Sequence, residues 1–245
     1  MHNVIIFTDL DGTLLDHDTY SWEPARPALS RIRELGIPLV LVTSKTRAEV
    51  RPLRAAIGVP GDDIVENGSY SQSLAAVRAA LTDAARETGV PVRAWGAMTV
   101  EEIAAAAGLP LEAAALAAQR EYSEPFTILD EARAPELLGD LERRGLRWAR
   151  GGRFHHVFER GGKGEAVRAY LERHPGARSI EPFSRARSIA LGDAPNDIPM
   201  LEAVDEPVIV RSARTADLLS QLPRAAVTSS PGPAGWNEWL QARLA

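Results

Sequence analysis

The segment Val4-Ile5-Ile6-Phe7-Thr8-Asp9-Leu10-Asp11-Gly12-Thr13 decides the fold class. Its first five residues are apolar or β-branched, as in a strand that is buried on both faces. The next five form a loop that carries two carboxylates and a glycine. A buried strand that opens directly into a polar loop is typical of open α/β sheets, in which ligands bind beyond the carboxyl ends of the strands.

The same arrangement recurs along the chain. Residues 37–42 form a second apolar run that ends in Thr43-Ser44-Lys45, and residues 188–191 form another that ends in Gly192-Asp193. Shorter strand patterns lie at residues 63–66 and 207–210, and helical patterns lie at residues 24–35, 47–57, 165–173 and 235–244, the last with Trp236 and Trp239 as expected core anchors. Strands that alternate with helices predict a Rossmann-like parallel sheet with helices on both faces.

The middle of the chain has a different texture. Alanine-rich helical patterns at residues 74–87, 99–107 and 111–118 are interleaved with strand patterns at residues 91–95, 126–129, 146–149 and 154–158. We therefore expect an α/β core domain formed by residues 1–74 and 159–245, interrupted by an inserted α+β domain over residues 75–158. Both units have ordinary domain sizes.

Composition excludes several classes of function. The net charge of -5 argues against a nucleic-acid or anionic-membrane partner, because neither would be attracted to this surface. The chain has no cysteine, so disulfides, thiolate nucleophiles and cysteine metal sites are excluded. With no long apolar run and no leader-like segment before the first strand, we expect a soluble cytoplasmic protein. The sequence does not indicate an oligomeric state.

The polar residues at the predicted strand ends form a candidate site. Asp9, Asp11, Thr43 and Asp193 all follow apolar runs, so a parallel sheet would bring them to one edge. Carboxylates that close repel one another unless a cation or a shared proton intervenes, and an all-oxygen set suits Mg²⁺. Lys163 would add a compact positive charge and Thr43 a hydroxyl donor. Such a site suits a phosphoryl group with a carboxylate placed for attack.

Lysine is scarce in this chain. Lys45 and Lys163 are its two lysines, against 26 arginines among the 28 basic residues. A position that requires a compact ammonium on a thin stem does not accept the planar guanidinium of arginine. Scarcity alone leaves chance as an equal alternative, but both lysines lie beside predicted strand ends or motif positions, so we expect them to be functional.

These residues resemble the motifs of the haloacid dehalogenase superfamily. Asp9-Leu10-Asp11-Gly12-Thr13 is similar to its first motif, Thr43 to its second, Lys163 to its third and Gly192-Asp193-Ala194-Pro195-Asn196-Asp197 to its fourth. The resemblance implies that Asp9 is the nucleophile, that Asp11 is the general acid and base, and that Thr43 and Lys163 assist. It also implies that Mg²⁺ is held by Asp9, the main-chain carbonyl of Asp11, and Asp193, and that the inserted domain is a substrate-binding cap.

Further segments resemble the mannosyl-3-phosphoglycerate phosphatase branch of that superfamily. They are Thr43-Ser44-Lys45-Thr46-Arg47, Glu66-Asn67-Gly68, Arg120-Glu121-Tyr122-Ser123-Glu124-Pro125-Phe126 and Gly151-Gly152-Arg153-Phe154-His155, with Ser69 as a departure from the expected glycine. The resemblance implies a phosphorylated sugar-glycerate as substrate. We expect it to be bound by Ser44, Lys45, Glu66, Asn67, Arg120, Glu121, Arg153 and Asn196, with the two arginines gripping the glycerate carboxylate. His155 and His156 alternate on a predicted strand, so we expect packing or surface roles for them.

Other functions remain open on the sequence alone. The glucosyl analogue could replace the mannosyl substrate, and a general sugar-phosphate or nucleotide phosphatase would use the same core. A receiver-like phosphoacceptor domain also combines aspartates, a threonine and a lysine, but its phosphoacceptor follows a later strand and it has no place for the insertion. A catalytically inactive binding module is disfavoured because no motif carboxylate is missing.

Overall fold

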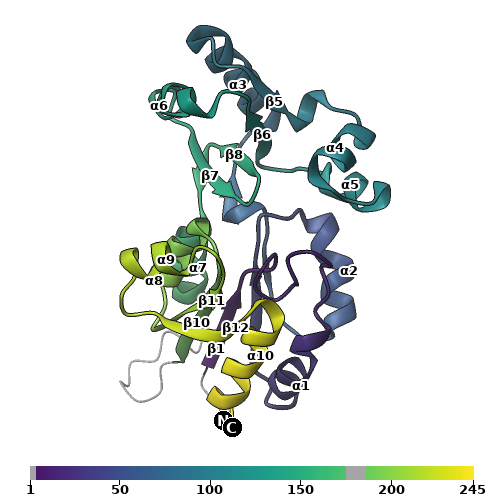
Figure 1. The fold of residues 1–245 in the computed structure, drawn as a ribbon, viewed down its shortest axis with the longest axis vertical. Coiled ribbons are helices and arrows are strands. Elements are labelled where there is room, and N and C mark those ends of the chain that lie inside the picture. The colour runs from purple at the N-terminus through teal and green to yellow at the C-terminus, as the bar shows by residue number, and fades with distance from the viewer. Residues whose placement is uncertain (1–3, 175–185) are drawn as a thin grey trace.

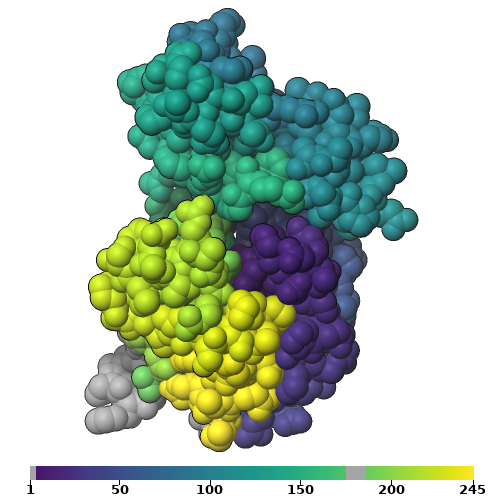
Figure 2. Space-filling view, viewed as in Figure 1, coloured from purple at the N-terminus to yellow at the C-terminus, as the bar shows by residue number. Residues whose placement is uncertain are grey.

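The computed structural model describes residues 4–174 and 186–245, which form two stacked parts (Figure 1). The lower part, the core, is built on a six-stranded sheet, and the upper part, the cap, is built on a four-stranded sheet. The space-filling view shows the cap seated on one end of the core (Figure 2). This is the α/β core with an inserted α+β cap that the sequence predicts.

The core sheet is parallel, with the strand order β12-β11-β10-β1-β2-β3. Its strands are β1 (Val4–Thr8), β2 (Leu39–Val42), β3 (Asp63–Ile64), β10 (Arg187–Gly192), β11 (Glu206–Arg211) and β12 (Ala226–Pro231). The register places Thr8 of β1 beside Leu191 of β10 and Leu41 of β2. The segments that follow β1, β2 and β10 therefore start at one edge of the sheet.

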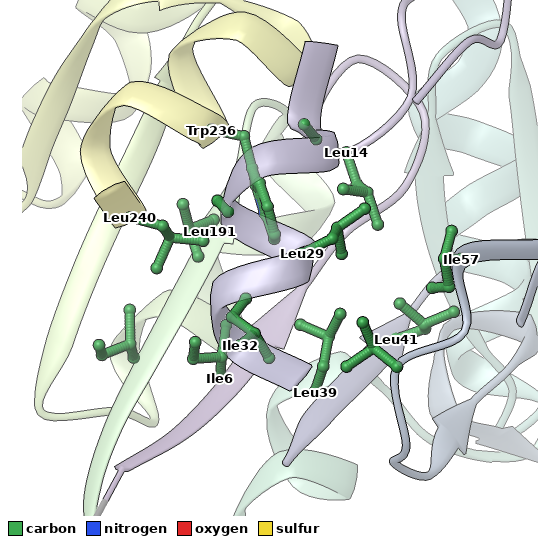
Figure 3. Close-up of a cluster of buried hydrophobic side chains, with 14 of the residues drawn as sticks. Ile6, Leu14, Leu29, Ile32, Leu39, Leu41, Ile57, Leu191, Trp236 and Leu240 are labelled. Atoms are coloured by element: carbon green, nitrogen blue, oxygen red, sulfur yellow. The ribbon is translucent and has the colours of Figure 1, made fainter. Parts of the chain in front are cut away.

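Helices cover both faces of this sheet. One face packs against α1 (Arg26–Glu34), α2 (Arg47–Ile57) and α10 (Gly232–Arg243), and the other against α7 (Lys163–Arg173), α8 (Ile198–Glu202) and α9 (Thr215–Gln221). Figure 3 shows Leu29 and Ile32 of α1 and Trp236 of α10 against the first face. Full burial of one such side chain contributes about 1.5–3 kcal/mol.

Trp236 also supports the strand that leads to the candidate site. Its indole nitrogen donates to Thr8 Oγ1 at 3.0 Å, and the Thr8 hydroxyl donates to the carbonyl of Asp9 at 2.8 Å. Both Thr8 and Trp236 are fully buried. The last helix thus fixes the end of β1 through a buried polar chain, and its expected role as a core anchor is confirmed for Trp236.

The cap sheet is antiparallel, with the order β5-β6-β8-β7. Its strands are β5 (Val92–Ala94), β6 (Glu124–Ile128), β7 (Arg147–Gly151) and β8 (Phe154–Phe158). Helices α3 (Leu74–Thr88) and α6 (Ala134–Arg143) share one hydrophobic cluster with this sheet, whereas α4 (Val100–Ala107) and α5 (Leu111–Ala117) form a second cluster with Trp95.

Two short strands lie where the chain passes between the two parts. β4 (Ser69–Tyr70) pairs antiparallel with β9 (Arg160–Gly161). Ser71 Oγ accepts from the Glu159 backbone and donates to the carbonyl of Tyr122 at 2.6 Å. We propose domain boundaries beside this pair, with residues 75–158 as the cap and residues 1–74 and 159–245 as the core.

Some elements were not predicted. The expected strand over residues 63–66 is shorter because Glu66 and Asn67 adopt positive φ values of 50° and 61°. Helix α6 was missed although Ala134, Leu137, Leu138 and Leu141 form an apolar face, whereas α8, α9 and β12 are short or polar and lack a clear apolar pattern. Residues 1–3, which the sequence places before the first strand, lie outside the described residues. No helix in the described part of the chain is both long enough and apolar enough to cross a membrane.

Candidate active site

The predicted site residues Asp9, Thr43 and Asp193 lie at one edge of the core sheet. The backbone N–H of Asp9 donates to the carbonyl of Leu191 at 2.9 Å, which continues the ladder between β1 and β10. The N–H of Thr43 donates to the carbonyl of Ile64 on the other side. Asp193 directly follows β10. The parallel register therefore brings together residues that are far apart in the sequence.

A tight turn after β1 fits its first loop against Asp193. The N–H groups of Thr13 and Leu15 both donate to the carbonyl of Leu10, at 3.1 and 2.8 Å. Gly12 has a φ of 81°, and a Cβ at this position would lie 2.6 Å from Asp193 Oδ2. Thr13 Oγ1 donates to Asp193 Oδ1 at 2.9 Å. The glycine is thus needed both for its backbone conformation and for the space that the Asp193 carboxylate fills.

Lys163 lies between two aspartates. Its Nζ is 2.6 Å from Asp9 Oδ1 and 2.7 Å from Asp197 Oδ1, and its side chain is fully buried at the first turn of α7. Burial alone would lower the pKa of the Lys163 ammonium, but the charges of Asp197 and Asp9 raise it above its ordinary value. The ammonium is therefore charged and holds the Asp9 side chain in place.

Two carboxyl groups of the site, those of Asp9 and Asp193, have raised pKa values. Burial, and then the charge of Asp197, raise the pKa of Asp9 well above its usual range, against the lowering effect of Lys163. Burial and Asp197 also raise the pKa of Asp193 to about 7. Repulsion and desolvation of this kind are what a bound cation relieves.

The cluster fits a divalent, oxygen-preferring cation. One carboxylate oxygen from each of Asp9, Asp193 and Asp197 lies within 4.8 Å of the others. Such a donor set, all oxygen and mostly buried, suits Mg²⁺ better than zinc. Asp197 is the member that sequence reasoning left without a role. Its Oδ2 accepts the N–H groups of Asp193 and Ala194, both at 3.0 Å. Asp197 therefore orients both this loop and the Lys163 side chain. Its place as the second aspartate of the fourth motif is the sequence signal that could have identified this role.

Asp11 lies apart from this carboxylate cluster and pairs with Lys45. Lys45 Nζ is 3.0 Å from Asp11 Oδ1 and 3.7 Å from Glu49 Oε1, and it lies 4.8 Å from the centre of the Tyr20 ring. Burial would lower the pKa of Lys45, but Asp11 and Glu49 raise it above its ordinary value. Both lysines of the chain therefore contact an aspartate of the first motif.

Glu66 differs from its expected role as an acceptor for sugar hydroxyls. Its carboxylate is fully buried and accepts the backbone N–H groups of Glu121, Tyr122 and Ser123, at 2.7, 3.1 and 2.8 Å. It also accepts the Ser123 hydroxyl at 2.8 Å. These four donors join the core to the cap, so the side chain is committed to the fold.

The two arginines expected to bind a carboxylate of the substrate are also engaged within the protein. Arg120 is 3.3 Å from Glu66 Oε2 and donates to Ser123 Oγ and the carbonyl of Ser44. Arg153 is exposed and donates to the carbonyl of Ala107 at the end of α4. A bidentate grip on a substrate carboxylate would therefore compete with these internal contacts, which the sequence alone does not reveal.

Other expected substrate residues do meet at the junction of core and cap. Asn196 Nδ2 donates to Asn67 Oδ1 at 3.4 Å, and a Cβ on Gly151 of β7 would lie 3.4 Å from Asn196 Nδ2 and 4.0 Å from Ser44 Cβ. Among residues 4–174 and 186–245, Asn67 Nδ2 and Asn196 Oδ1 are buried atoms without a hydrogen-bond partner. Glu121 lies nearby and is half-exposed, 3.4 Å from Arg47. The two amide groups are thus free to bind a polar ligand.

His156 was expected to have a packing or surface role, and it is buried in the cap sheet between Pro125 and Ala149. Burial lowers its pKa well below the ordinary value, and the nearby positive charges of Arg120 and Lys163 act in the same direction. The imidazole is therefore neutral. Its neighbour His155 faces Phe126 and Trp148, with ring centroids 5.5 and 6.0 Å away.

Sequence comparison places this fold and site in a family. Residues 6–77 match the haloacid dehalogenase-like hydrolase family. A glucosyl-3-phosphoglycerate/mannosyl-3-phosphoglycerate phosphatase from Methanococcoides burtonii is 36% identical, over 95% of this chain and 94% of that protein. A protein of the same name from Persephonella marina is 35% identical, over 96% of this chain and 95% of that protein. The chain belongs to the haloacid dehalogenase-like hydrolases, as a phosphatase of that superfamily.

Solved structures share the whole architecture. A haloalkanoate-superfamily phosphatase from Bacteroides thetaiotaomicron aligns with a TM-score of 0.70 at 22% identity, covering 98% of this chain and 95% of that one. The sucrose-phosphatase from Synechocystis sp. PCC6803 aligns with a TM-score of 0.65 at 18% identity, covering 100% of this chain and 98% of that one. At these identities the likeness concerns the fold, including the cap. Within the superfamily, the chain is similar along nearly its full length to the phosphoglycerate-glycoside phosphatases named above.

Proposed function

We propose that this protein hydrolyses the phosphate monoester of mannosyl-3-phosphoglycerate or of its glucosyl analogue, and releases the sugar-glycerate and phosphate. The observation that carries the proposal is the contact of the buried Asp9 carboxylate with Lys163 at 2.6 Å, beside the oxygen cluster of Asp193 and Asp197. The names of the two relatives, similar over nearly the whole chain, support the substrate.

In the proposed reaction Asp9 attacks phosphorus and forms an aspartyl phosphate. Lys163 fixes the attacking carboxylate and keeps a positive charge beside the transferred group, because its ammonium is held by Asp9 and Asp197. Asp11 donates a proton to the leaving oxygen and later accepts one from water. The Asp11 side chain is partly exposed, so water can reach it.

Asp9, the main-chain carbonyl of Asp11, and Asp193 would hold Mg²⁺, and Thr13 and Asp197 orient Asp193. The ion would neutralise phosphate charge and orient the phosphoryl oxygens. The raised pKa values of both carboxyl groups are consistent with a place for this cation. Thr43 follows β2 at the same edge of the sheet, and we propose that its hydroxyl binds a phosphoryl oxygen.

The sugar-glycerate moiety would lie where the cap meets the core. Asn67 and Asn196 offer buried amide atoms without partners in the described chain, and an amide can bind sugar hydroxyls as donor or acceptor. Ser44 and Gly151 border the same place. Arg120 and Arg153, which the sequence suggested for the glycerate carboxylate, already have partners within the protein.

A turnover screen tests the substrate. The purified protein is assayed with Mg²⁺ on mannosyl-3-phosphoglycerate, glucosyl-3-phosphoglycerate, 3-phosphoglycerate and simple hexose phosphates, with Asp9→Asn as the inactive control. We expect kcat/KM for the two glycosides to exceed the others by at least about 100-fold, the range that a few substrate-specific contacts supply. Equal efficiency on hexose phosphates would replace the proposal with a general sugar-phosphate phosphatase.

A further inference from the structure

In the loop after β2, residues 43–45, each backbone carbonyl accepts a hydrogen bond from another part of the chain. The carbonyl of Thr43 accepts the N–H of Asn67 at 2.7 Å, and that of Lys45 accepts the N–H of Glu66 at 2.8 Å. Between them, the carbonyl of Ser44 accepts Arg120 Nη1 at 3.1 Å. Three consecutive carbonyls are thus fixed. The outer two are held by a turn of the core, and the middle one by a side chain of the cap.

The guanidinium that holds Ser44 is itself firmly placed. Arg120 Nη2 donates to Ser123 Oγ at 2.6 Å and lies 3.3 Å from Glu66 Oε2. The side chains of Arg120 and Glu66 are 2% and 0% exposed, so the pair is shielded from water and salt. The guanidinium presents five N–H donors in a fixed planar fork, a geometry that the three donors on the flexible lysine stem do not reproduce.

Glu66 also links the core to the cap: it is a core residue that binds the cap, whereas Arg120 is a cap residue that binds the core. The backbone of Glu66 holds the carbonyl of Lys45, and its carboxylate holds the backbone of Glu121, Tyr122 and Ser123 in the cap. Thr46, next to the loop, donates to the carbonyl of Leu116 at 3.0 Å. The buried pair of Arg120 and Glu66 therefore joins the position of the cap to the shape of the loop over residues 43–45.

We propose that Arg120 is a positioning residue that couples the seating of the cap to the phosphate-binding loop over residues 43–45. The inference rests on the proposed function, since it takes Thr43 as a phosphate contact. It assigns Arg120 an effect on every phosphate monoester, through the loop, in place of recognition of one carboxylate. When the cap is not packed on the core, the carbonyl of Ser44 loses its hydrogen bond from Arg120 and the loop is less ordered. Phosphate then binds poorly until the cap closes.

The test compares two arginines that each pair with a fully buried glutamate, although Arg78 is 40% exposed and Arg120 only 2%. Arg120→Lys breaks the pair with Glu66 and the contact with Ser44. Arg78→Lys is the matched control, because Arg78 of α3 pairs with the equally buried Glu124 at 2.7 Å inside the cap. The readouts are kcat and KM for a small aryl phosphate that has no carboxylate, the inhibition constant of inorganic phosphate, and the Tm. Competition by inorganic phosphate measures the loop without the sugar-glycerate.

For Arg120→Lys we expect kcat/KM on the aryl phosphate to fall by at least about tenfold and phosphate inhibition to weaken in parallel, the effect of losing one charge-assisted hydrogen bond. Arg78→Lys should stay within about twofold of the wild type on the aryl phosphate, with a smaller loss of Tm because Arg78 is partly exposed. Wild-type handling of the aryl phosphate and of phosphate by Arg120→Lys would overturn the proposal. Equal losses in both variants would also overturn it, because they would indicate general loosening of the cap.

A milder variant covers the case in which Arg120→Lys does not fold. Ser123→Ala removes the hydroxyl that binds Arg120 and Glu66, and we expect a smaller loss of phosphate affinity in the same direction. An unchanged inhibition constant would overturn the proposal. Failure of the proposed function would look different, since the wild type itself would then not hydrolyse phosphate monoesters.

Discussion

Removing the charge of Lys163 should cost stability in a way that depends on pH. Its Nζ lies 2.6 Å from Asp9 and 2.7 Å from Asp197, so each attraction is about 6 kcal/mol at an effective dielectric constant of about 20. Desolvation of the three charges offsets most of this. The net cost of leaving buried charges unpaired is about 3–5 kcal/mol, and this is the loss in the free energy of unfolding that we expect for Lys163→Met.

The raised pKa values of the neighbouring carboxyl groups determine how the destabilisation by Lys163→Met varies with pH. Asp9 and Asp193 have pKa values raised above those of the unfolded chain, that of Asp193 to about 7. Carboxyl groups of this kind favour the folded state below the unfolded pKa, and this contribution is lost as the pH rises through the folded pKa. The variant should therefore be most destabilised near pH 8 and partly recover near pH 5, where these groups take up protons.

Urea denaturation of the metal-free wild type and variant at pH 8 and pH 5 measures the loss in the free energy of unfolding. Lys45→Met is the control, since Lys45 pairs with the partly exposed Asp11 and should cost less. A loss for Lys163→Met below about 1 kcal/mol, the value of a surface pair, would refute the reasoning. So would a larger loss at acid pH.

Two further predictions follow from the site and the cap. Because the cluster of Asp9, Asp193 and Asp197 offers only oxygen donors, EDTA should abolish turnover, Mg²⁺ should restore it and zinc should not; full activity in metal-free buffer would contradict this. His156 is buried and neutral while the unfolded chain protonates this side chain near its ordinary pKa of 6.5, so this group lowers stability as the pH drops below that value. Asp9 and Asp193 contribute with the opposite sign, so the test is the difference: between about pH 7 and 5, the Tm of His156→Leu should fall less, or rise more, than that of the wild type. Identical pH profiles for variant and wild type would show that His156 does not titrate in this way.

Much of the fold could be predicted because the apolar runs are unambiguous. Val4–Thr8 and Leu39–Val42 are buried on both faces of the sheet, and such strands show continuous hydrophobicity. β12 reads Ala-Val-Thr-Ser-Ser-Pro and lies at the sheet edge, where polar residues are tolerated, so its sequence gives little signal. Short helices such as α8 are formed by packing on the sheet, which no local pattern records.

The core of the site was predictable for a topological reason. In a parallel sheet the residues that follow β1, β2 and β10 must meet at one edge, so Asp9, Thr43 and Asp193 could be placed together without coordinates. The internal partners of the individual side chains could not be predicted from the sequence. Arg120 is one of 26 arginines, and its pairing with Glu66 joins residues that are far apart in the chain. The sequence therefore suggested a ligand contact where the fold has a buried ion pair.

The central claim is that Asp9 is the nucleophile, and the covalent intermediate tests it most directly. Asp11→Asn retains the nucleophile but lacks the base that activates water, so an aspartyl phosphate should accumulate when it is mixed with an activated aryl phosphate and Mg²⁺. After an acid quench, peptide mass spectrometry should find one phosphoryl adduct on Asp9, labile to hydroxylamine and lost in the Asp9→Asn, Asp11→Asn double variant. An adduct on another residue, or turnover by Asp9→Asn alone, would contradict the account.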